Sequence, residues 1–184
     1  DLLWRAFDSG HNSLSNASRI ARLEVKLDRP DRALQVFRES LSRPYVSARH
    51  WQLAATQIDT HIGLQQALPY YERAADDGGT TNLAAYLRAL QRAGDYDEMH
   101  RRILGFLAEQ GSTPTSIGIL LARLDLDALP SATRREVLDA YAQAGGVQVG
   151  LSSRVLDMYA ASENWGAALA YLPRLHASGS SGTP

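Results

Sequence analysis

The stretch LAAYLRALQRAGDYDEMHRRILGF, residues 83–106, contains two amphipathic segments separated by a short turn. In the first segment apolar side chains recur three and four positions apart, at Leu83, Tyr86, Leu87 and Leu90. This is the spacing of one face of a helix. Gly94-Asp95 interrupts the pattern, and a second helical pattern begins at Tyr96. The stretch therefore predicts a helix over 83–93, a turn, and a helix over 96–110.

The same order of helix, turn and helix recurs on both sides of this stretch. Upstream, the apolar spacing predicts helices over 16–27, 31–43, 51–58 and 64–75. Downstream, it predicts helices over 152–161 and 165–175. No segment alternates apolar and polar residues cleanly enough to predict a strand. The sequence thus predicts an all-α protein built from helix pairs.

Equivalent positions of the first two pairs are separated by a constant distance along the chain. Ala33 and Ala67 begin the second helices of these pairs and lie 34 residues apart, as do Phe37 and Tyr71. A period of 34 residues for a unit of helix, turn and helix is that of the tetratricopeptide repeat.

On these residues the chain resembles the tetratricopeptide-repeat (TPR) family. The matching positions of three units are Trp51, Ala54, Ala55, Ile58, Ala67, Tyr71 and Ala74; Leu83, Tyr86, Leu87, Leu90, Gly94-Asp95-Tyr96 and Met99; and Val155, Leu156, Tyr159, Asn164-Trp165, Ala168 and Leu172. The resemblance implies an α–α superhelix of about five helix pairs over residues 14–177, in which neighbouring pairs stack because no pair buries its apolar face alone. Residues 1–13 would be the remnant of an upstream helix, with Leu2, Leu3, Trp4 and Phe7 on its buried side, and residues 178–184 a flexible tail.

Two regions depart from the repeat pattern. Between Gly111 and Gly146 two helices are expected, over about 116–124 and 131–144, but their register stays open because Tyr141 also fits a first helix. Pro69 and Pro173 fall inside second helices, where proline removes a backbone donor and is expected to kink or shorten the helix.

Composition and motifs favour a non-catalytic protein. The net charge is -1, from 19 basic and 20 acidic residues, and there are no cysteines. This balance argues against a nucleic-acid binder, which normally has a basic excess. The five histidines are scattered, and neither a metal-binding nor a phosphate-binding motif is present. Gly78-Gly79-Thr80-Thr81 is interpreted as a helix end followed by a helix start. We expect no catalytic, cofactor-binding or metal site.

The resemblance implies that the first helix of each pair lines a concave groove. Carried onto this chain, the positions that face the groove and are expected to bind a partner are Arg19, Arg22, Lys26, Arg49, Gln52, Arg88, Gln91, Arg92 and Arg154, together with Ser18, Thr56 and Asp59. Arginine suits the paired hydrogen bonds that hold carboxylates. Two interpretations stay open: a groove for an acidic peptide or anionic polymer, or arginines that are solvated or paired with nearby acids. The carboxylate clamp of chaperone-binding TPR proteins is not matched, because Ser18 and Arg22 stand at its lysine and asparagine positions.

The alanine- and arginine-rich repeats are similar in style to the periplasmic TPR arrays of bacterial exopolysaccharide export proteins of the Pel type. This similarity implies a protein-interaction scaffold, part of a longer protein that acts in biofilm formation, which recruits a polysaccharide-modifying enzyme or guides polymer. A cytoplasmic regulatory or chaperone-type module that binds an acidic peptide is the alternative, and an RNA-binding helical repeat is a third. Membrane attachment is expected only through other parts of the parent protein.

Overall fold

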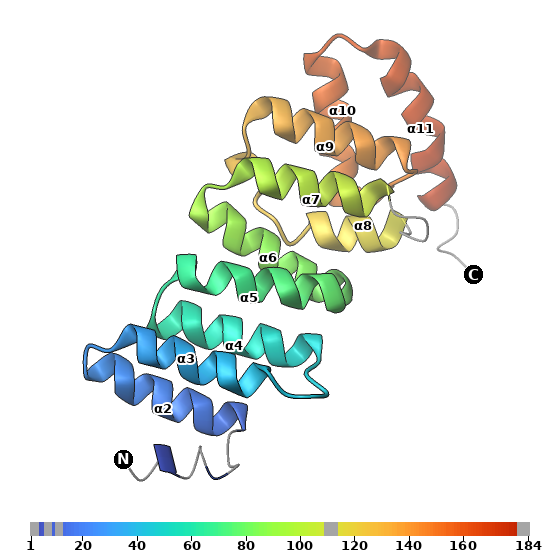
Figure 1. The fold of residues 1–184 in the computed structure, drawn as a ribbon. Helices are drawn as coiled ribbons and strands as arrows, with labels where there is room; N and C mark the ends of the chain where they lie inside the picture. The colour runs from blue at the N-terminus through green and yellow to red at the C-terminus, as the bar shows by residue number, and fades with distance from the viewer. Residues whose placement is uncertain (1–3, 6–8, 10–12, 109–113, 180–184) are drawn as a thin grey trace. The chain divides into compact units, whose positions relative to one another are not determined.

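The computed structural model describes residues 4–5, 9, 13–108 and 114–179 (Figure 1). In these ranges the chain forms ten α-helices and one 3-10 helix and contains no strand, which confirms the predicted all-α class. The chain divides into two compact units, Asp1–Ala93 (unit 1) and Gly94–Pro184 (unit 2). The division falls in the turn predicted at Gly94-Asp95, so the two helices of that pair belong to different units. A single array over residues 14–177 stays a prediction.

Unit 1 contains α2 (Leu14–Lys26), α3 (Pro30–Leu41), α4 (Ala48–His61), α5 (Leu64–Asp77) and α6 (Gly79–Ala93). Each helix packs on the next along the chain, and α2 also packs on α4. Short turns connect α2 to α3 and α4 to α5, as expected for two antiparallel pairs (Figure 1). We call α2, α4 and α6 the first helices of unit 1, and α3 and α5 its second helices.

Small side chains bring the helices of unit 1 close together. Alanines from all five helices are fully buried or nearly so: Ala17, Ala21, Ala33, Ala54, Ala55, Ala67, Ala74, Ala84 and Ala89. Larger side chains fill the spaces between them, and Phe37, Ile58 and Leu87 have no exposed surface. Ala33 and Ala67, which defined the repeat period, are both 0% exposed. Tight helix contacts at these positions explain why the period can be read from the sequence.

The first helix of the second pair is longer than predicted. The sequence places its end at Ile58, whereas α4 begins at Ala48 and continues to His61. The helix ends where the backbone N–H groups of Ile62 and Gly63 both donate to the Ile58 carbonyl, at 2.8 and 2.9 Å. Gly63 has a φ of 149°, a conformation that favours glycine. Asp59, predicted to lie in a turn, is therefore a helical residue.

Neither internal proline shortens its helix. Pro69 lies inside α5 and Pro173 inside α11 (Trp165–Gly179), and both helices continue past it. Both prolines are on exposed positions, so the carbonyl that each leaves without a helical donor can be satisfied by water. Shortening, one of the two effects expected of these prolines, therefore does not occur, and a kink stays a prediction.

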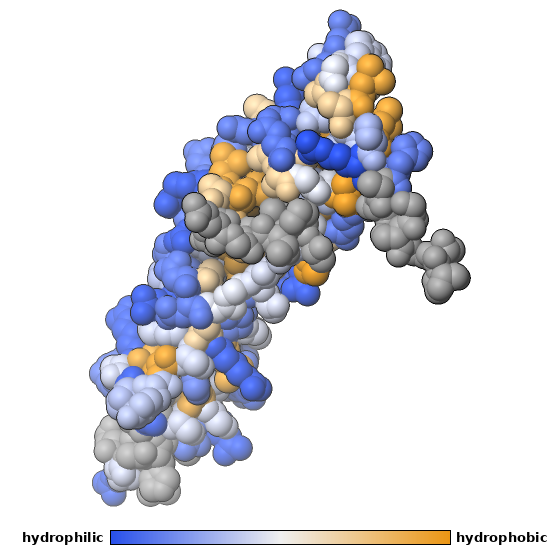
Figure 2. Space-filling view, turned by 90° about the vertical axis from the view of Figure 1, so that its right-hand side faces the viewer, coloured by the Kyte–Doolittle hydropathy of each residue, from blue (hydrophilic) through white to orange (hydrophobic). Residues whose placement is uncertain are grey.

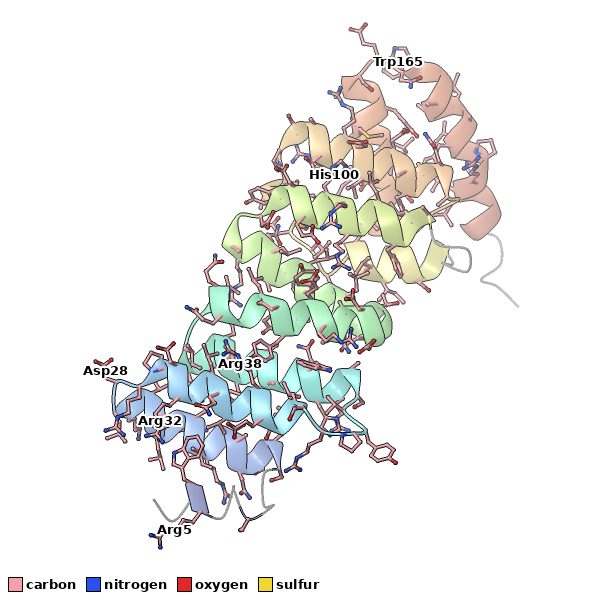
Figure 3. The ribbon with its side chains drawn as sticks, viewed as in Figure 1. Arg5, Asp28, Arg32, Arg38, His100 and Trp165 are labelled. Atoms are coloured by element: carbon pink, nitrogen blue, oxygen red, sulfur yellow. The ribbon has the colours of Figure 1, made fainter. Side chains whose placement is uncertain are left out.

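Trp4 is bound to the first helix pair. Its indole Nε1 donates to Glu24 Oε1 at 2.6 Å, and the guanidinium carbon of Arg32 lies 5.0 Å from the centre of its ring (Figure 3). Arg29 and Arg32 each place a nitrogen 4.0 Å from Glu24 Oε2, so the buried carboxylate of Glu24 has cationic neighbours. The predicted buried positions Leu2, Leu3 and Phe7 lie outside the described residues.

Unit 2 contains α7 (Tyr96–Ala108), α8 (Pro114–Leu121), η1 (Leu126–Ala128), α9 (Ser131–Gln143), α10 (Val149–Ala161) and α11 (Trp165–Gly179). The central helix is α9, which packs on α7, α8 and α10, and α10 packs on α11. The helix expected over about 116–124 is shifted toward the N-terminus, since α8 begins at Pro114 and ends at Leu121. The predicted tail begins in helix, because α11 includes Ser178 and Gly179, and residues 180–184 lie outside the described residues.

Buried tyrosines connect the last three helices of unit 2. The Tyr141 hydroxyl accepts the backbone N–H of Gln148 at 2.8 Å, and the Tyr171 hydroxyl donates to the Gly146 carbonyl at 2.6 Å. The Tyr159 hydroxyl donates to Asp139 Oδ1 at 2.9 Å. Burial, and then this contact with a carboxylate, raise the pKa of Tyr159 to about 12.

The outer face of α11 is apolar. Trp165, Leu169 and Leu172 are 61%, 67% and 37% exposed and lie three and four residues apart. Figure 2 shows hydrophobic side chains, in orange, exposed on the surface in the part of unit 2 that contains α10 and α11. No helix among the described residues combines the length and apolarity that crossing a bilayer requires.

Candidate partner-binding surfaces

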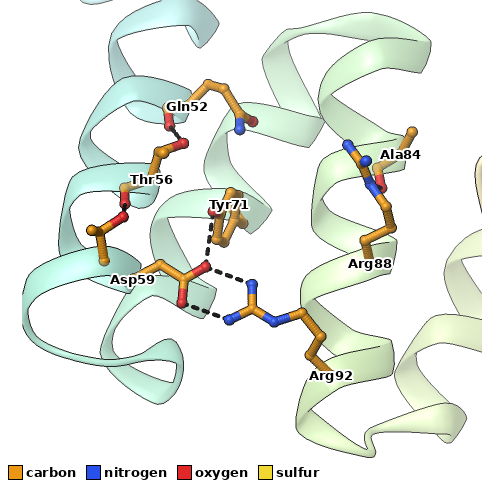
Figure 4. A network of polar contacts seen from close by, with 8 residues as sticks. Gln52, Thr56, Asp59, Tyr71, Ala84, Arg88 and Arg92 are labelled. Atoms are coloured by element: carbon orange, nitrogen blue, oxygen red, sulfur yellow. Dashed lines mark hydrogen bonds and ion pairs between the residues drawn. The ribbon is translucent and has the colours of Figure 1, made fainter.

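An ion pair joins two first helices of unit 1. Arg92 of α6 donates from Nη1 to Asp59 Oδ2 at 2.8 Å and from Nη2 to Oδ1 at 2.9 Å, which is the paired geometry of arginine and carboxylate (Figure 4). Tyr71 of α5 donates its hydroxyl to the same carboxylate at 3.2 Å. The hydrogen bond from Arg92 outweighs partial burial and holds the pKa of Asp59 below its usual value. For Arg92, the structure supports the paired interpretation.

The neighbouring groove residues are only partly available to a partner. Arg88 is exposed, and its Nε donates to the Ala84 carbonyl of its own helix at 3.3 Å (Figure 4). Gln52 is half-buried, and its side-chain oxygen has no hydrogen-bond partner among the described residues. Gln91 is half-buried and already has a polar contact.

Four predicted groove residues have exposed cationic groups. They are Arg19, Arg22 and Lys26 of α2 and Arg49 of α4. The described part of the chain provides no ion-pair partner for any of the four. Because Arg19, Arg22 and Lys26 are spaced by three and four residues, they share one face of α2.

Charge in unit 1 is segregated between first and second helices. The first helices contain six basic residues, Arg19, Arg22, Lys26, Arg49, Arg88 and Arg92, against two acidic ones, Glu24 and Asp59. The second helices contain three basic residues, Arg32, Arg38 and Arg73, against five acidic ones, Asp31, Glu39, Glu72, Asp76 and Asp77. Both acids of the first helices are bound to groups of the chain itself. A nearly neutral chain thus has a basic excess on the first helices of unit 1, and we call its exposed members Arg19, Arg22, Lys26 and Arg49 the basic surface of unit 1.

Arg154, the remaining predicted groove residue, belongs to unit 2. Its guanidinium donates to both carboxylate oxygens of Asp127, at 3.1 and 2.9 Å. Arg134 also donates to Asp127, at 3.3 Å. The predicted residues therefore divide into a basic surface on unit 1 and a separate arginine cluster on unit 2.

Sequence reasoning did not identify the ion pairs at these sites. Asp59 and Arg92 are 33 residues apart, close to one repeat period, and opposite charges at this separation on successive first helices are a usable signal. Arg134 and Asp127 lie in the region whose register the sequence left open, so they could not be assigned to a face.

Candidate metal ligands do not form a cluster among the described residues. No group of three or more His, Asp or Glu side chains that could hold a metal ion is found among them. His100 lies with its Nε2 3.0 Å from Glu136 Oε2, a contact between α7 and α9 (Figure 3).

Comparison with known proteins finds similarity of structure only. No family model matches the chain, and no curated protein matches it. Among solved structures, the chain is similar to YrrB, a TPR protein with an unusual peptide-binding site, at 14% identity and a TM-score of 0.44 over 95% of this chain and 91% of that one. It is similar to the MamA RS-1 ArsTM double mutant at 9% identity and a TM-score of 0.44 over 91% and 95%, and to PilF of Pseudomonas aeruginosa at 16% identity and a TM-score of 0.43 over 89% and 75%. At these identities and scores the similarities assign no partner to this chain.

Proposed function

We propose that the chain is a non-catalytic interaction scaffold that holds an acidic segment of a partner protein on the basic surface of unit 1. The observation that carries the proposal is the segregation of charge, six basic against two acidic residues on the first helices. Asp59 and Glu24 do not neutralise this surface, because Arg92 pairs with Asp59 and Glu24 is buried on the other side of α2. Arg19, Arg22, Lys26 and Arg49 provide the cations.

The acidic ligand follows from the residue types. Arginine offers several donors in a planar arrangement that matches a carboxylate, and exposed arginines on neighbouring helices can hold a short run of acidic side chains. Since α2 packs on α4, Arg22 and Arg49 belong to adjoining helices. Binding of this kind depends on salt, because exposed charges are screened.

The experiment is a fluorescence anisotropy titration with a labelled oligoglutamate peptide. The test variant Arg22→Gln/Arg49→Gln removes two cations from first helices, and the control variant Arg38→Gln/Arg73→Gln removes two from second helices. We expect the test variant to bind at least about threefold more weakly and the control to stay within about twofold of the original chain. Equal losses in the two variants would refute the proposal. Tighter binding of oligouridylate than of oligoglutamate would favour the RNA-binding alternative.

We also propose a biological setting for the scaffold. The resemblance to Pel-type repeat arrays supports a role in bacterial exopolysaccharide export, in the periplasm, with a polysaccharide-modifying enzyme as partner or an anionic polymer as guided cargo. Affinity purification of the parent protein from its native cell tests this setting. Recovery of such an enzyme is the expected result, whereas recovery of cytoplasmic signalling proteins or chaperones would support the cytoplasmic alternative.

A further inference from the structure

A pocket of about 330 Å³ lies between α9 and α10 in unit 2. Three arginines line it, Arg134 and Arg135 of α9 and Arg154 of α10, together with two aspartates, Asp127 and Asp157. Its remaining lining is apolar or small: Leu138, Met158, Ala161 and Ser131. The pocket therefore offers cationic donors beside an apolar surface.

The pocket already holds a carboxylate, which belongs to the chain itself. Asp127 lies in η1, a single turn outside both helices, and Arg154 binds its two oxygens at 3.1 and 2.9 Å. Arg134 adds a hydrogen bond of 3.3 Å to Oδ1. The arrangement shows which chemical group these arginines accept, since paired donors of a guanidinium match the two oxygens of a carboxylate.

The contact with Asp127 is exposed enough to be exchanged. The side chain of Asp127 is 66% exposed, and those of Arg154 and Arg134 are 41% and 36% exposed. Ion pairs in such positions contribute little to stability. An external carboxylate can therefore replace Asp127 without unfolding any helix.

Arg135 is a further cation at the same pocket. It is exposed, and it has no ion-pair partner within the described ranges. The pocket lining thus contains three arginines and two carboxylates, those of Asp127 and Asp157. It keeps a net positive charge even when Asp127 stays bound to Arg154.

The adjoining pocket limits what the ligand can be. A second pocket of about 420 Å³ shares Arg135 and Met158 with the first. Its other lining residues include two carboxylates, Glu136 and Asp139, and the amide of Asn164. These carboxylates repel a second acidic group, so the two pockets together suit one acidic side chain followed by a neutral or apolar one.

We propose that the α9–α10 pocket binds a single carboxylate, carried beside an apolar side chain in an extended segment of a partner protein. Asp127 is an internal competitor that occupies the arginines when the segment is absent. This site is separate from the basic surface of unit 1, and it prefers one acidic residue over a run of them.

The test is an NMR titration of the full chain with the peptide N-acetyl-Leu-Asp-Leu-amide. Two further peptides serve as probes, one with Asn in place of Asp and one with three consecutive Asp residues. We expect the Leu-Asp-Leu peptide to shift amide signals of α9 and α10, and the other two to bind more weakly. Equal binding of the Asn peptide would overturn the carboxylate assignment, and tighter binding of the triple-Asp peptide would overturn the preference for one acid.

Variants test the role of Asp127. Asp127→Asn removes the competitor and is expected to tighten binding of the Leu-Asp-Leu peptide by about two- to fivefold, the range that an exposed ion pair provides. Arg154→Gln should weaken the binding by at least about two- to fivefold, whereas Arg38→Gln, the same change in unit 1, should leave it unchanged. Unchanged or weaker binding by Asp127→Asn shows that Asp127 does not compete. If Arg154→Gln unfolds α10, Arg135→Gln gives the second measurement, and unchanged binding there contradicts the proposal.

Discussion

Replacement of Ile58 by alanine tests whether buried contacts of α4 stabilise the stacked helices of unit 1. Ile58 is 0% exposed, and the change removes three carbon atoms from its side chain. At about 0.8 kcal/mol for each buried methylene the lost transfer free energy is about 2.4 kcal/mol. The cavity left behind adds to this value, so the expected loss in the free energy of unfolding is about 2.5–5 kcal/mol.

The same helix provides a matched control. Leu53 also lies in α4 and is 46% exposed, and Leu53→Ala removes the same number of carbon atoms. Its expected cost is about 1.3 kcal/mol or less, because nearly half of this side chain already contacts water and its removal leaves no closed cavity. Ile58→Val gives an intermediate value, about 0.5–1.5 kcal/mol, if the alanine variant does not fold.

Urea unfolding followed by tryptophan fluorescence and far-ultraviolet circular dichroism measures these differences. Trp51 lies in α4 and reports on unit 1. A cost for Ile58→Ala no larger than that of Leu53→Ala would show that α4 is not packed as described. A lower denaturant slope in the Ile58→Ala variant would instead show that the change alters how much surface unfolding exposes.

Three further predictions concern ionisation and packing. The coupling free energy between Asp59 and Arg92 in a double-mutant cycle should be at least about 1 kcal/mol, more than a fully exposed pair gives, since the Asp59 side chain is only 12% exposed and both of its oxygens accept from Arg92. Because Arg92 lowers the pKa of Asp59, the stabilisation by this pair is present above about pH 4 and is lost as the pH falls further. Urea unfolding at neutral and acidic pH measures this loss of stability, and the Asp59→Asn variant should not show it. The pKa of Tyr159 is raised to about 12, so stability should decline as the pH rises from about 10 toward that value, and Tyr159→Phe should reduce the decline. Gly146→Ala should cost about 1–3 kcal/mol in thermal unfolding, because the added carbon would collide with a buried tyrosine ring, whereas Gly150→Ala, where the space is open, should cost nothing.

The helices of unit 1 were predictable because their packing leaves a periodic record in the sequence. Ala33 and Ala67 are fully buried at equivalent places, and only small residues fit there. Boundaries were less predictable. The end of α4 depends on the backbone conformation of Gly63, and its φ of 149° cannot be predicted from the sequence. The apolar spacing stops at Ile58, because the last turn of the helix is polar.

The candidate sites were predictable only as lists of positions. Resemblance to a repeat family placed Arg22 and Arg92 on first helices, but it could not say that one has an acid partner and the other has none. That difference depends on whether an acid occurs near the same place one repeat earlier, as Asp59 does for Arg92. In the region whose register stayed open, the sequence did not identify the positions themselves. Arg134 and Arg135 lie in this region, and the α9–α10 pocket that they line was therefore not predicted.

Pairing between an arginine and an acid of the chain itself does not exclude a role in binding. The free-energy cost of separating an ion pair depends on how deeply its two side chains are buried. Asp59 is only 12% exposed and also accepts a hydrogen bond from Tyr71, so releasing Arg92 would strand a desolvated carboxylate. Asp127 is 66% exposed and lies on a single 3-10 turn, so water replaces Arg154 at little cost. Of the two paired arginines predicted to face a groove, Arg154 is therefore the one that a partner's carboxylate can recruit.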